Sequence, residues 1–354
     1  MKRILPLLFA ILLFAIYPVQ ALACTSFAVY RKSVLYGMNF DYSDVPVRYV
    51  ITQSGDTAVF HVDFETYGHY VPIAGMNGHG MFLAVQMLYP EELGTIEANS
   101  NKAELHTFAE QALFHMKSME EVKKQLDEQQ LVNTFLTLHC MLADPNGEAM
   151  VLEPGKERNR ITQNRGDYLV MTNFSNADAF NPDTQEMENV DCERYLAAES
   201  YIVQSGDAFT IEDGLEALKR SMQSGGSFPT QNSMVCDPVN GDIYIVVQRD
   251  FEKVWKVSLT QKTIESYSGF AQPIKRNLDE QGITAQELIA LANTPQAEQL
   301  DPAQAPAKAV DQPVALPGDL PVRQVVLGPL AIAGICLVGL CIIGAVWLLR
   351  RKRR

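Results

Sequence analysis

Metal-binding patterns are missing from this chain of 354 residues. It has neither a Cys-x-x-Cys pair nor a His-Glu-x-x-His segment, which are spacings that zinc sites use. Its histidines also lack the spacing of a ligand set, at His61, His69, His79, His106, His115 and His139. The sequence therefore predicts a site without a metal, and no other cofactor is expected.

Cysteine is scarce as well. Of the six cysteines, two fall in an apolar stretch at 327–349, and Cys24 follows a predicted cleavage site. The remaining three are an odd number, which argues against a disulfide framework. Small, buried, unpaired side chains are favoured for Cys140, Cys192 and Cys236, with a single bridge as the alternative.

Basic residues are few compared with acidic ones. Seven of the 29 Lys and Arg residues lie in 1–23 and 350–354, so the rest of the chain has 22 against 42 acidic residues, a net charge of −20. Such a charge argues against nucleic acid as a partner. It also disfavours strongly anionic ligands, unless a local basic pocket binds them.

The N-terminus has the three parts of a secretory signal peptide. Lys2-Arg3 is followed by the apolar run 4–16 and by Ala21-Leu22-Ala23, a small-x-small cleavage site. Cleavage there would remove the signal peptide, residues 1–23, and leave Cys24 as the first residue. The alternative is a lipoprotein signal, in which Cys24 carries a lipid and its amine is acylated. Ala21 argues against this alternative, because lipoprotein signals prefer Leu at that position.

A single membrane anchor is predicted at the other end. Residues 327–349 are an uncharged apolar stretch of 23 residues, long enough for a helix to cross a bilayer. The basic tail 350–354 should stay in the cytoplasm. The preceding Pro/Ala/Gln-rich segment, 294–326, is typical of a disordered linker. The sequence thus predicts a single-pass protein of the cell membrane with its domain outside and its C-terminus in the cytoplasm.

The segment 24–293 is predicted to be one large domain, because no linker-like stretch interrupts it. It opens with a predicted hairpin, and strand clusters then alternate with helix clusters, which indicates a layered α+β fold with helices on the outer faces of antiparallel sheets. Strands are predicted at 24–30, 34–40, 49–52, 58–62, 81–87, 135–143, 149–153, 168–172, 233–236 and 243–248. Helices are predicted at 103–129 with a break near Ser118, and at 191–203, 211–222 and 284–293, with capping boxes beginning at Ser118 and Thr284.

Cys24 is the strongest candidate for a catalytic residue. After the predicted cleavage it would have a thiol and a free α-amine on one residue. The α-amine has a pKa of about 7.7 to 8.0 and can take the thiol proton at neutral pH. Nucleophile and base would therefore come from one residue, without a histidine.

Several short segments of the domain are informative when they are considered together. The opening hairpin contains Cys24-Thr25-Ser26-Phe27 and Gly37-Met38-Asn39-Phe40-Asp41. Further matching segments lie at 75–81, 87–90, 138–153, 171–174, 191–197 and 230–244. Together they resemble the choloylglycine hydrolase and penicillin V acylase family of N-terminal nucleophile amidohydrolases, over most of residues 24–257. The resemblance implies an αββα sandwich fold.

The resemblance also implies roles for four residues. Cys24 would be the nucleophile, and Asp41 would orient its α-amine. Asn173 matches the asparagine that stabilises the oxyanion, a contribution of about 2.7 to 4 kcal/mol in enzymes of this kind. Arg194 would hold the charge network of the site or position the carbonyl of the nucleophile. Without that context, Asp41 and Asn173 are ordinary strand-end and turn residues, and Arg194 is a solvated helical arginine paired with a nearby Glu.

Two positions depart from the family pattern, and a third is interpreted as structural. Where the family often has Leu-Asn-Phe-Pro with a second oxyanion donor, this chain has Met87-Leu88-Tyr89-Pro90. The second donor is thus open between Tyr89, a backbone N–H and another group. Met38 replaces an arginine that would lower the pKa of the thiol. We assign Tyr89 and Met38 to substrate binding, and we interpret His139 as a residue of the core.

These features predict a membrane-anchored, extracytoplasmic hydrolase of linear amides. Its partners would be an N-acylated small molecule with an apolar acyl group and, through the C-terminal helix, the membrane. Transfer of the acyl group to another amine is one alternative. Another is an inactive, lipoprotein-like binding or sensor module that has kept the fold. The oligomeric state is open, and a homo-oligomer is one option.

Overall fold

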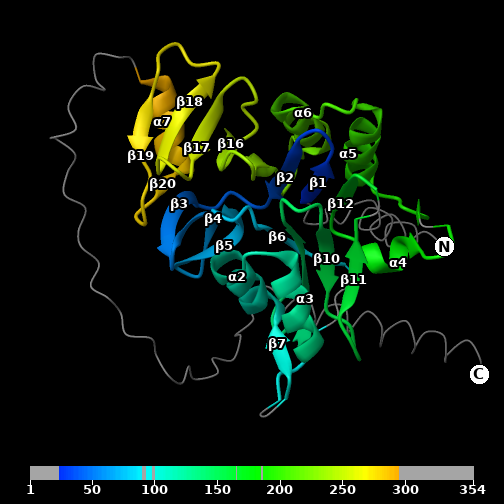
Figure 1. The fold of residues 1–354 in the computed structure, drawn as a ribbon. Helices are drawn as coiled ribbons and strands as arrows, with labels where there is room; N and C mark the ends of the chain where they lie inside the picture. Colours follow the sequence, from blue (N-terminus) through cyan, green and yellow to red (C-terminus); the bar gives the residue numbers. More distant parts are fainter. Residues whose placement is uncertain (1–23, 90–92, 98–99, 165, 185, 295–354) are drawn as a thin grey trace, which may run out of the picture. The chain divides into compact units, whose positions relative to one another are not determined.

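The computed structural model describes residues 24–89, 93–97, 100–164, 166–184 and 186–294 (Figure 1). These residues lie in one compact unit, which ends before residue 301. The predicted signal peptide 1–23, the linker beyond Thr294, the membrane span 327–349 and the basic tail lie outside the described residues. Within the described ranges, no helix has the length and apolar character needed to cross a membrane.

Two eight-stranded antiparallel sheets form the centre of the domain. In spatial order, the first sheet contains β12 (Tyr168–Met171), β1 (Thr25–Tyr30), β2 (Val34–Asp41), β15 (Thr230–Asp237), β16 (Asp242–Val247), β17 (Val254–Ser258), β18 (Thr263–Ser268) and β19 (Lys275–Asn277). The second contains β11 (Arg160–Gln163), β10 (Ala149–Glu153), β9 (Leu138–Ala143), β6 (Phe82–Met87), β5 (His69–Asn77), β4 (Thr57–Thr66), β3 (Val47–Ser54) and β20 (Ile283–Thr284). Two small ribbons pair β13 (Phe180–Asn181) with β14 (Glu186–Met187) and β7 (Lys102–Glu104) with β8 (Gln130–Val132).

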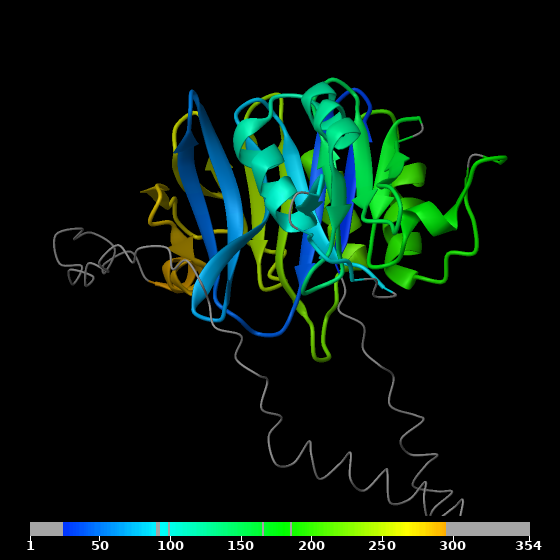
Figure 2. The same ribbon diagram turned by 90° about the horizontal axis from the view of Figure 1, so that it is seen from below.

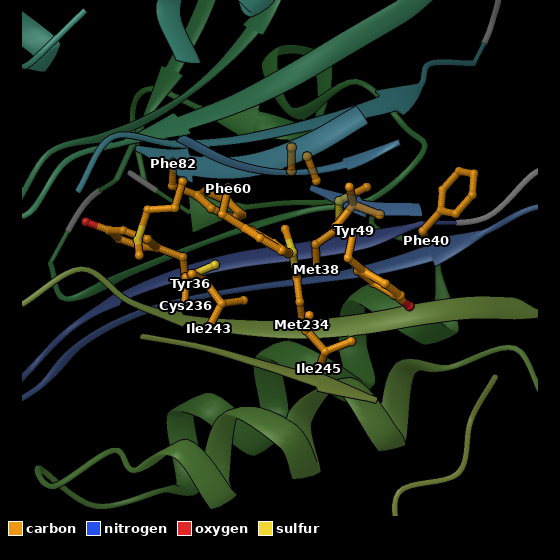
Figure 3. Close-up of a cluster of buried hydrophobic side chains, with 14 of the residues drawn as sticks. Tyr36, Met38, Phe40, Tyr49, Phe60, Phe82, Met234, Cys236, Ile243 and Ile245 are labelled. Atoms are coloured by element: carbon orange, nitrogen blue, oxygen red, sulfur yellow. The ribbon is translucent and has the colours of Figure 1, made fainter. Parts of the chain in front are cut away.

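A hydrophobic core lies between the two sheets (Figure 3). Alternate residues of each strand point into it, as the two-residue period of a strand requires. The rings of Tyr36 and Phe82, from opposite sheets, stack with their centroids 5.1 Å apart. Met38 and Met234 are fully buried in the same cluster. Each such side chain contributes roughly 1.5 to 3 kcal/mol by burial, so this layer holds the sheets together.

Helices cover the outer face of each sheet. On the second sheet, α2 (Leu105–His115) and α3 (Met119–Glu128) bury their apolar side chains against strand residues such as Leu83 and Leu142. On the first, α5 (Glu193–Gln204) and α6 (Ile211–Ser221) do the same against Phe27 and Val235. Figures 1 and 2 show the two helix pairs on opposite sides of the sheets. The short α4 (Asn176–Ala179) follows β12, and α7 (Ala285–Asn293) adds side chains to the central core. The predicted layered α+β fold is confirmed.

Local predictions can be compared with these elements. The break between α2 and α3 is at Ser118, whose side chain accepts the Glu121 N–H as an N-cap. The Glu121 carboxylate accepts from the Lys117 N–H instead of the Ser118 N–H, so the predicted capping box is only half formed. The capping box at Thr284 is complete.

Two further predictions, on the state of the cysteines and on one strand boundary, can be compared with the structure. Cys24, Cys140, Cys192 and Cys236 are all unpaired. The strand predicted from Phe135 begins only at Leu138, because residues 133–137 form a loop that exposes Phe135 and Leu136.

Candidate active site

The β1–β2 hairpin places Cys24 at the end of the first sheet, beside Asp41. Cys24 directly precedes β1, and the pairing of Thr25 with Asn39 brings it next to the end of β2. The residue is almost completely buried, at 5% exposure. The Asp41 N–H points at the Cys24 Sγ over 3.5 Å, and Sγ lies 3.8 Å from the Asp41 carbonyl oxygen. The backbone of Asp41 therefore fixes the position of the sulfur.

Asn173 lies opposite Cys24 on the other side of β1. It follows β12, which pairs with β1 through Ser26 and Met171. The backbone N–H of Cys24 donates to the Asn173 Oδ1 over 2.6 Å. The Asn173 Nδ2 donates to the carbonyl oxygen of Met87 over 2.7 Å. The amide thus holds the nitrogen that would become an α-amine after cleavage.

Arg194, in the first turn of α5, contacts the other three predicted site residues. Its Nη1 donates to the Cys24 carbonyl oxygen over 2.7 Å. Both terminal nitrogens lie 3.4 Å from the Asn173 Oδ1, and Nη1 is 3.9 Å from the Asp41 Oδ2. Arg194 therefore contacts the Cys24 carbonyl, and its role in positioning that carbonyl for catalysis stays a prediction.

Asp41 is buried, at 1% exposure, and is not the surface turn residue of the alternative interpretation. Its Oδ1 accepts a hydrogen bond from the Thr230 hydroxyl. Burial raises the pKa of Asp41 to about 7, although the hydrogen bond from Thr230 and the charges of Arg194 and Arg249 oppose this rise. Near neutral pH the carboxyl group therefore exists in both protonation states.

Thr230 and Arg249 are site residues that the sequence did not reveal. Thr230 pairs with Asp41 between β15 and β2, where the register shifts. Arg249 donates from Nη1 to the Thr230 carbonyl oxygen, so it holds the backbone of Thr230 in place. Thr230 does begin a segment that resembles the closing hairpin of the family, but nothing in the segment predicts that it faces Asp41.

The thiol of Cys24 is protonated in this environment. Burial and, to a smaller extent, the charge of Asp41 raise its pKa to about 12, although the hydrogen bond from the Asp41 backbone and the charge of Arg194 oppose this rise. A thiolate is the reactive form of cysteine, so attack on a carbonyl needs a base. In the described part of the chain, the hydrogen bonds of Sγ involve only the Asp41 backbone.

The two predicted substrate-binding positions lie in different surroundings. The Tyr89 N–H donates to the Asn173 carbonyl oxygen over 3.0 Å, and Tyr89 lines a groove of about 520 Å³ with Phe174 and Asp178. Met38 is fully buried in the core between the sheets, in the cluster that contains Cys24. The roles of Tyr89 as oxyanion donor and of Met38 in substrate binding stay predictions.

A second surface groove reaches the site through Arg194. It has a volume of about 540 Å³ and is bordered by Arg194, Cys192, Met222 and Gln223. Among the described residues, no three His, Cys, Asp or Glu side chains are grouped as metal ligands would be. The groups that meet around Cys24 are a carboxyl group, an amide and a guanidinium.

Comparison with known proteins gives independent evidence about the family of this chain. The family model described as linear amide C–N hydrolases, choloylglycine hydrolase family, matches residues 26–198. No curated protein matches the chain significantly.

Two solved structures share its fold at low sequence identity. A mutant of the conjugated bile acid hydrolase from Clostridium perfringens is 16% identical with a TM-score of 0.52, and the match covers 73% of this chain and 97% of that one. Penicillin V acylase from Agrobacterium tumefaciens is 15% identical with a TM-score of 0.55, and the match covers 69% and 91% of the two chains.

Proposed function

Because this chain belongs to the choloylglycine hydrolase family of linear amide C–N hydrolases, we propose that it hydrolyses an N-acylated small molecule through Cys24. The observation that carries the proposal is the position of Cys24. Its sulfur, nitrogen and carbonyl oxygen are each held by a different residue, namely Asp41, Asn173 and Arg194. A residue that served only the core would not need all three.

The proposed reaction starts with cleavage after Ala23, which turns the Cys24 nitrogen into an α-amine. This amine takes the thiol proton while Sγ attacks the carbonyl carbon of the amide. The tetrahedral intermediate collapses as the α-ammonium protonates the leaving amine, and a thioester remains on Cys24. A water molecule then attacks the thioester and gives a proton to the α-amine. The C–S bond breaks, the α-ammonium returns the proton to Sγ, and the carboxylic acid is released.

The high pKa of the Cys24 thiol indicates when its proton is transferred to the α-amine. A thiol with a pKa of about 12 does not transfer its proton fully to an amine with a pKa of about 8. A gap of roughly four pKa units corresponds to about 5 kcal/mol. We therefore expect proton transfer to occur together with attack on the carbonyl, without a stable thiolate beforehand.

Asn173 has a dual role in this proposal. Its Oδ1 orients the α-amine, and one N–H of its Nδ2 serves the Met87 carbonyl. An amide nitrogen has two N–H groups, and we assign the second to the developing oxyanion. Arg194 keeps the Cys24 carbonyl in place while Sγ moves toward the substrate.

An apolar acyl group is the substrate feature that the surroundings favour. Two loops beside the site, 93–97 and 133–136, are joined by a hydrogen bond of 2.7 Å from the Gly94 N–H to the Asn133 carbonyl oxygen. They expose large apolar side chains, at Leu93, Ile96, Phe135 and Leu136, and Phe135 is 91% exposed. The Leu88 N–H donates to the carbonyl oxygen of Thr137, so these loops lie next to the segment that holds Asn173.

The location of the enzyme is part of the proposal. The predicted signal peptide and the apolar stretch at 327–349 are the sequence features that support an extracytoplasmic domain tethered to the cell membrane. Substrates with long acyl chains collect in membranes, so a tether would bring enzyme and substrate together.

Two measurements test the proposed function. Intact mass and N-terminal sequencing of the membrane-extracted protein should show a free Cys24 as the first residue. A panel of N-acyl amino acids, N-acyl homoserine lactones, penicillin V and bile conjugates should then contain a substrate whose turnover falls at least ~10³-fold in Cys24→Ala. Undiminished turnover in that variant, or a lipid adduct on Cys24, would refute the proposal. Product analysis separates hydrolysis from acyl transfer.

A further inference from the structure

Three polar side chains form a buried row across the second sheet, namely Gln86 on β6, His139 on β9 and Glu153 on β10. Gln86 pairs directly with His139 between neighbouring strands. The pairing of Cys140 with Leu152 places Glu153 beside His139 on the next strand. All three side chains are almost completely buried. We call this set the cross-sheet row.

The cross-sheet row faces the first sheet. Side chains alternate between the two faces of a strand, so residues two or four positions apart share a face. Phe82, Met141 and Val151 stand at such positions on the same three strands, and all belong to the core between the sheets. The row therefore points at the layer that contains Cys24.

One end of the row holds the chain that follows Asn173. The Glu153 Oε2 accepts the hydroxyl of Ser175 over 2.7 Å, and its Oε1 accepts the backbone N–H of Asn176 over 2.6 Å. The Nδ1 of His139 lies 3.7 Å from the same Oε1, within reach of an ion pair. A carboxylate of the second sheet thus fixes the turn after an active-site residue of the first.

The other end of the row holds the strand of the nucleophile. The Gln86 Nε2 donates to the Ser26 hydroxyl over 2.7 Å, and Ser26 lies two residues after Cys24. The two ends therefore reach the two strands whose residues meet at the 2.6 Å contact between Cys24 and Asn173.

Burying these polar side chains costs free energy, so their presence in the core indicates a role that apolar side chains could not fill. A buried polar group that is left unpaired costs about 1 to 3 kcal/mol. Leu or Met at these positions would pack the two sheets equally well without that risk. Two members of the row form hydrogen bonds next to Cys24 and Asn173: Gln86 with the Ser26 hydroxyl, and Glu153 with the Ser175 hydroxyl and the backbone N–H of Asn176.

We propose that Glu153 is a positioning residue for the proposed amide hydrolysis, and that the cross-sheet row sets the position of Asn173 relative to Cys24. Asn173 lies just beyond β12, so the pairing of that strand does not fix it. The Tyr89 N–H holds its carbonyl oxygen, and Glu153 holds the next turn. Without Glu153, the Asn173 amide would lose its fixed direction toward the α-amine and the oxyanion.

The test compares two substitutions at one position in the mature, full-length enzyme. In Glu153→Gln, one oxygen can still accept from Asn176, and the new NH₂ group can donate to the Ser175 hydroxyl. In Glu153→Met, the length remains but both acceptors are lost. A misplacement of about 1 Å can lower a rate by 10². We expect kcat to fall about 100-fold in Glu153→Met and less than about 10-fold in Glu153→Gln, with KM changed less than about 3-fold in both.

Asp144 provides a matched control on the same hairpin. It ends β9 at the opposite end from Glu153, is equally buried, and accepts the backbone N–H groups of Met119 and Asn146, each over 2.9 Å. Asp144→Asn should lower the melting temperature as much as Glu153→Gln does, but it should leave kcat unchanged. Equal losses of kcat at both positions would show general destabilisation and overturn the proposal.

A second readout needs no substrate. In a Cys192→Ser background, the only remaining thiols of the described domain besides Cys24 are fully buried. The alkylation rate of Cys24 by iodoacetamide should fall at least ~10-fold in Glu153→Met, because the α-amine no longer lies where it can take the proton. If Glu153→Met does not fold, Ser175→Ala replaces it, since this variant removes one of the two hydrogen bonds.

The outcomes separate this proposal from the proposed function. Turnover that persists in Cys24→Ala would refute the function itself. Turnover that needs Cys24 but keeps its kcat in Glu153→Met, with an unchanged alkylation rate, would refute only the positioning role.

Discussion

Cys24 and Asn173 face each other across the β1–β12 pair, and the nitrogen of one donates to the amide oxygen of the other over 2.6 Å. In the uncut chain this nitrogen belongs to a peptide bond and has no basic lone pair. After cleavage the same atom would be an amine in the same place. The arrangement around this nitrogen therefore exists in the uncut chain, before the α-amine that the proposed reaction needs has formed.

Blocking the cleavage should leave a folded but inactive protein. Ala23→Leu removes the small residue that the cleavage site requires, so residues 1–23 should remain attached. We expect turnover below about 1% of the normal value, since Cys24 then has no α-amine to act as a base. Intact mass and turnover are the measurements.

Ala15→Leu is the control for this variant. It lies in the apolar run of the predicted signal peptide and keeps the run apolar. Normal processing and activity are expected. Full activity in an uncleaved Ala23→Leu protein would contradict the role of the α-amine.

Arg194→Lys should impair catalysis far more than stability. The guanidinium contacts the Cys24 carbonyl, Asn173 and Asp41 at once, and a single ammonium cannot repeat this geometry. We expect kcat to fall about 10²-fold or more, with a change in unfolding free energy of about 1 kcal/mol. Arg220→Lys is the control, because Arg220 is half exposed, forms an ion pair with Glu216 in the same helix and stacks on the Tyr201 ring. A kcat loss of similar size in both variants would contradict the assignment.

The raised pKa of Asp41 makes stability depend on pH. Its pKa is about 7 in the folded chain, against an ordinary value of 3.8, so the folded state binds a proton more tightly than the unfolded state does. The stability that this proton provides is fully present below about pH 4 and is lost as the pH rises through about 7. Over this range the unfolding free energy should fall with pH, by up to about 4 kcal/mol from this group.

Asp41→Asn removes this dependence, because an amide does not titrate. Urea unfolding of the uncut Ala23→Leu protein between pH 4 and 8, with and without Asp41→Asn, gives the comparison. We expect a flatter profile for the Asn variant and a higher relative stability above pH 7. Parallel profiles would show that Asp41 is ionised throughout.

The apolar loops beside the site should affect only long acyl chains. Phe135→Ser removes the most exposed aromatic side chain of these loops, and burial of such a side chain against a ligand contributes about 1.5 to 3 kcal/mol. KM for a long-chain N-acyl substrate should rise at least ~10-fold, with kcat unchanged and a short-chain substrate unaffected. Val239→Ser is the control, since Val239 is also well exposed but lies in the turn between β15 and β16. Equal effects on both chain lengths would contradict acyl binding by Phe135.

The fold could be predicted where the alternation of apolar and polar residues was regular. The opening hairpin and the α2–α3 break at Ser118 follow from alternation and from capping chemistry. The strand β5 was not predicted, because Pro72 and Gly75 interrupt it and because its register shifts against β4. The strand β18 was missed because its second half is polar and exposed.

The site was predictable only through resemblance. Cys24, Asp41, Asn173 and Arg194 are far apart in the chain, and only the family pattern joins them in advance. Thr230 was missed because its role depends on which strand pairs with β2, which no local pattern specifies. His139 was correctly expected in the core, although its place beside Glu153 could not be foreseen.

The burial of Cys24 also sets an order of events during the life of the protein. A protease must take the peptide bond between Ala23 and Cys24 into its own cleft in an extended form. In the folded domain, Cys24 is enclosed by Asp41, Asn173 and Arg194, so its backbone is closed to such an enzyme. We therefore expect the cut to be made during export, before β1 docks between β2 and β12. A chain that folds first would then stay a permanent zymogen.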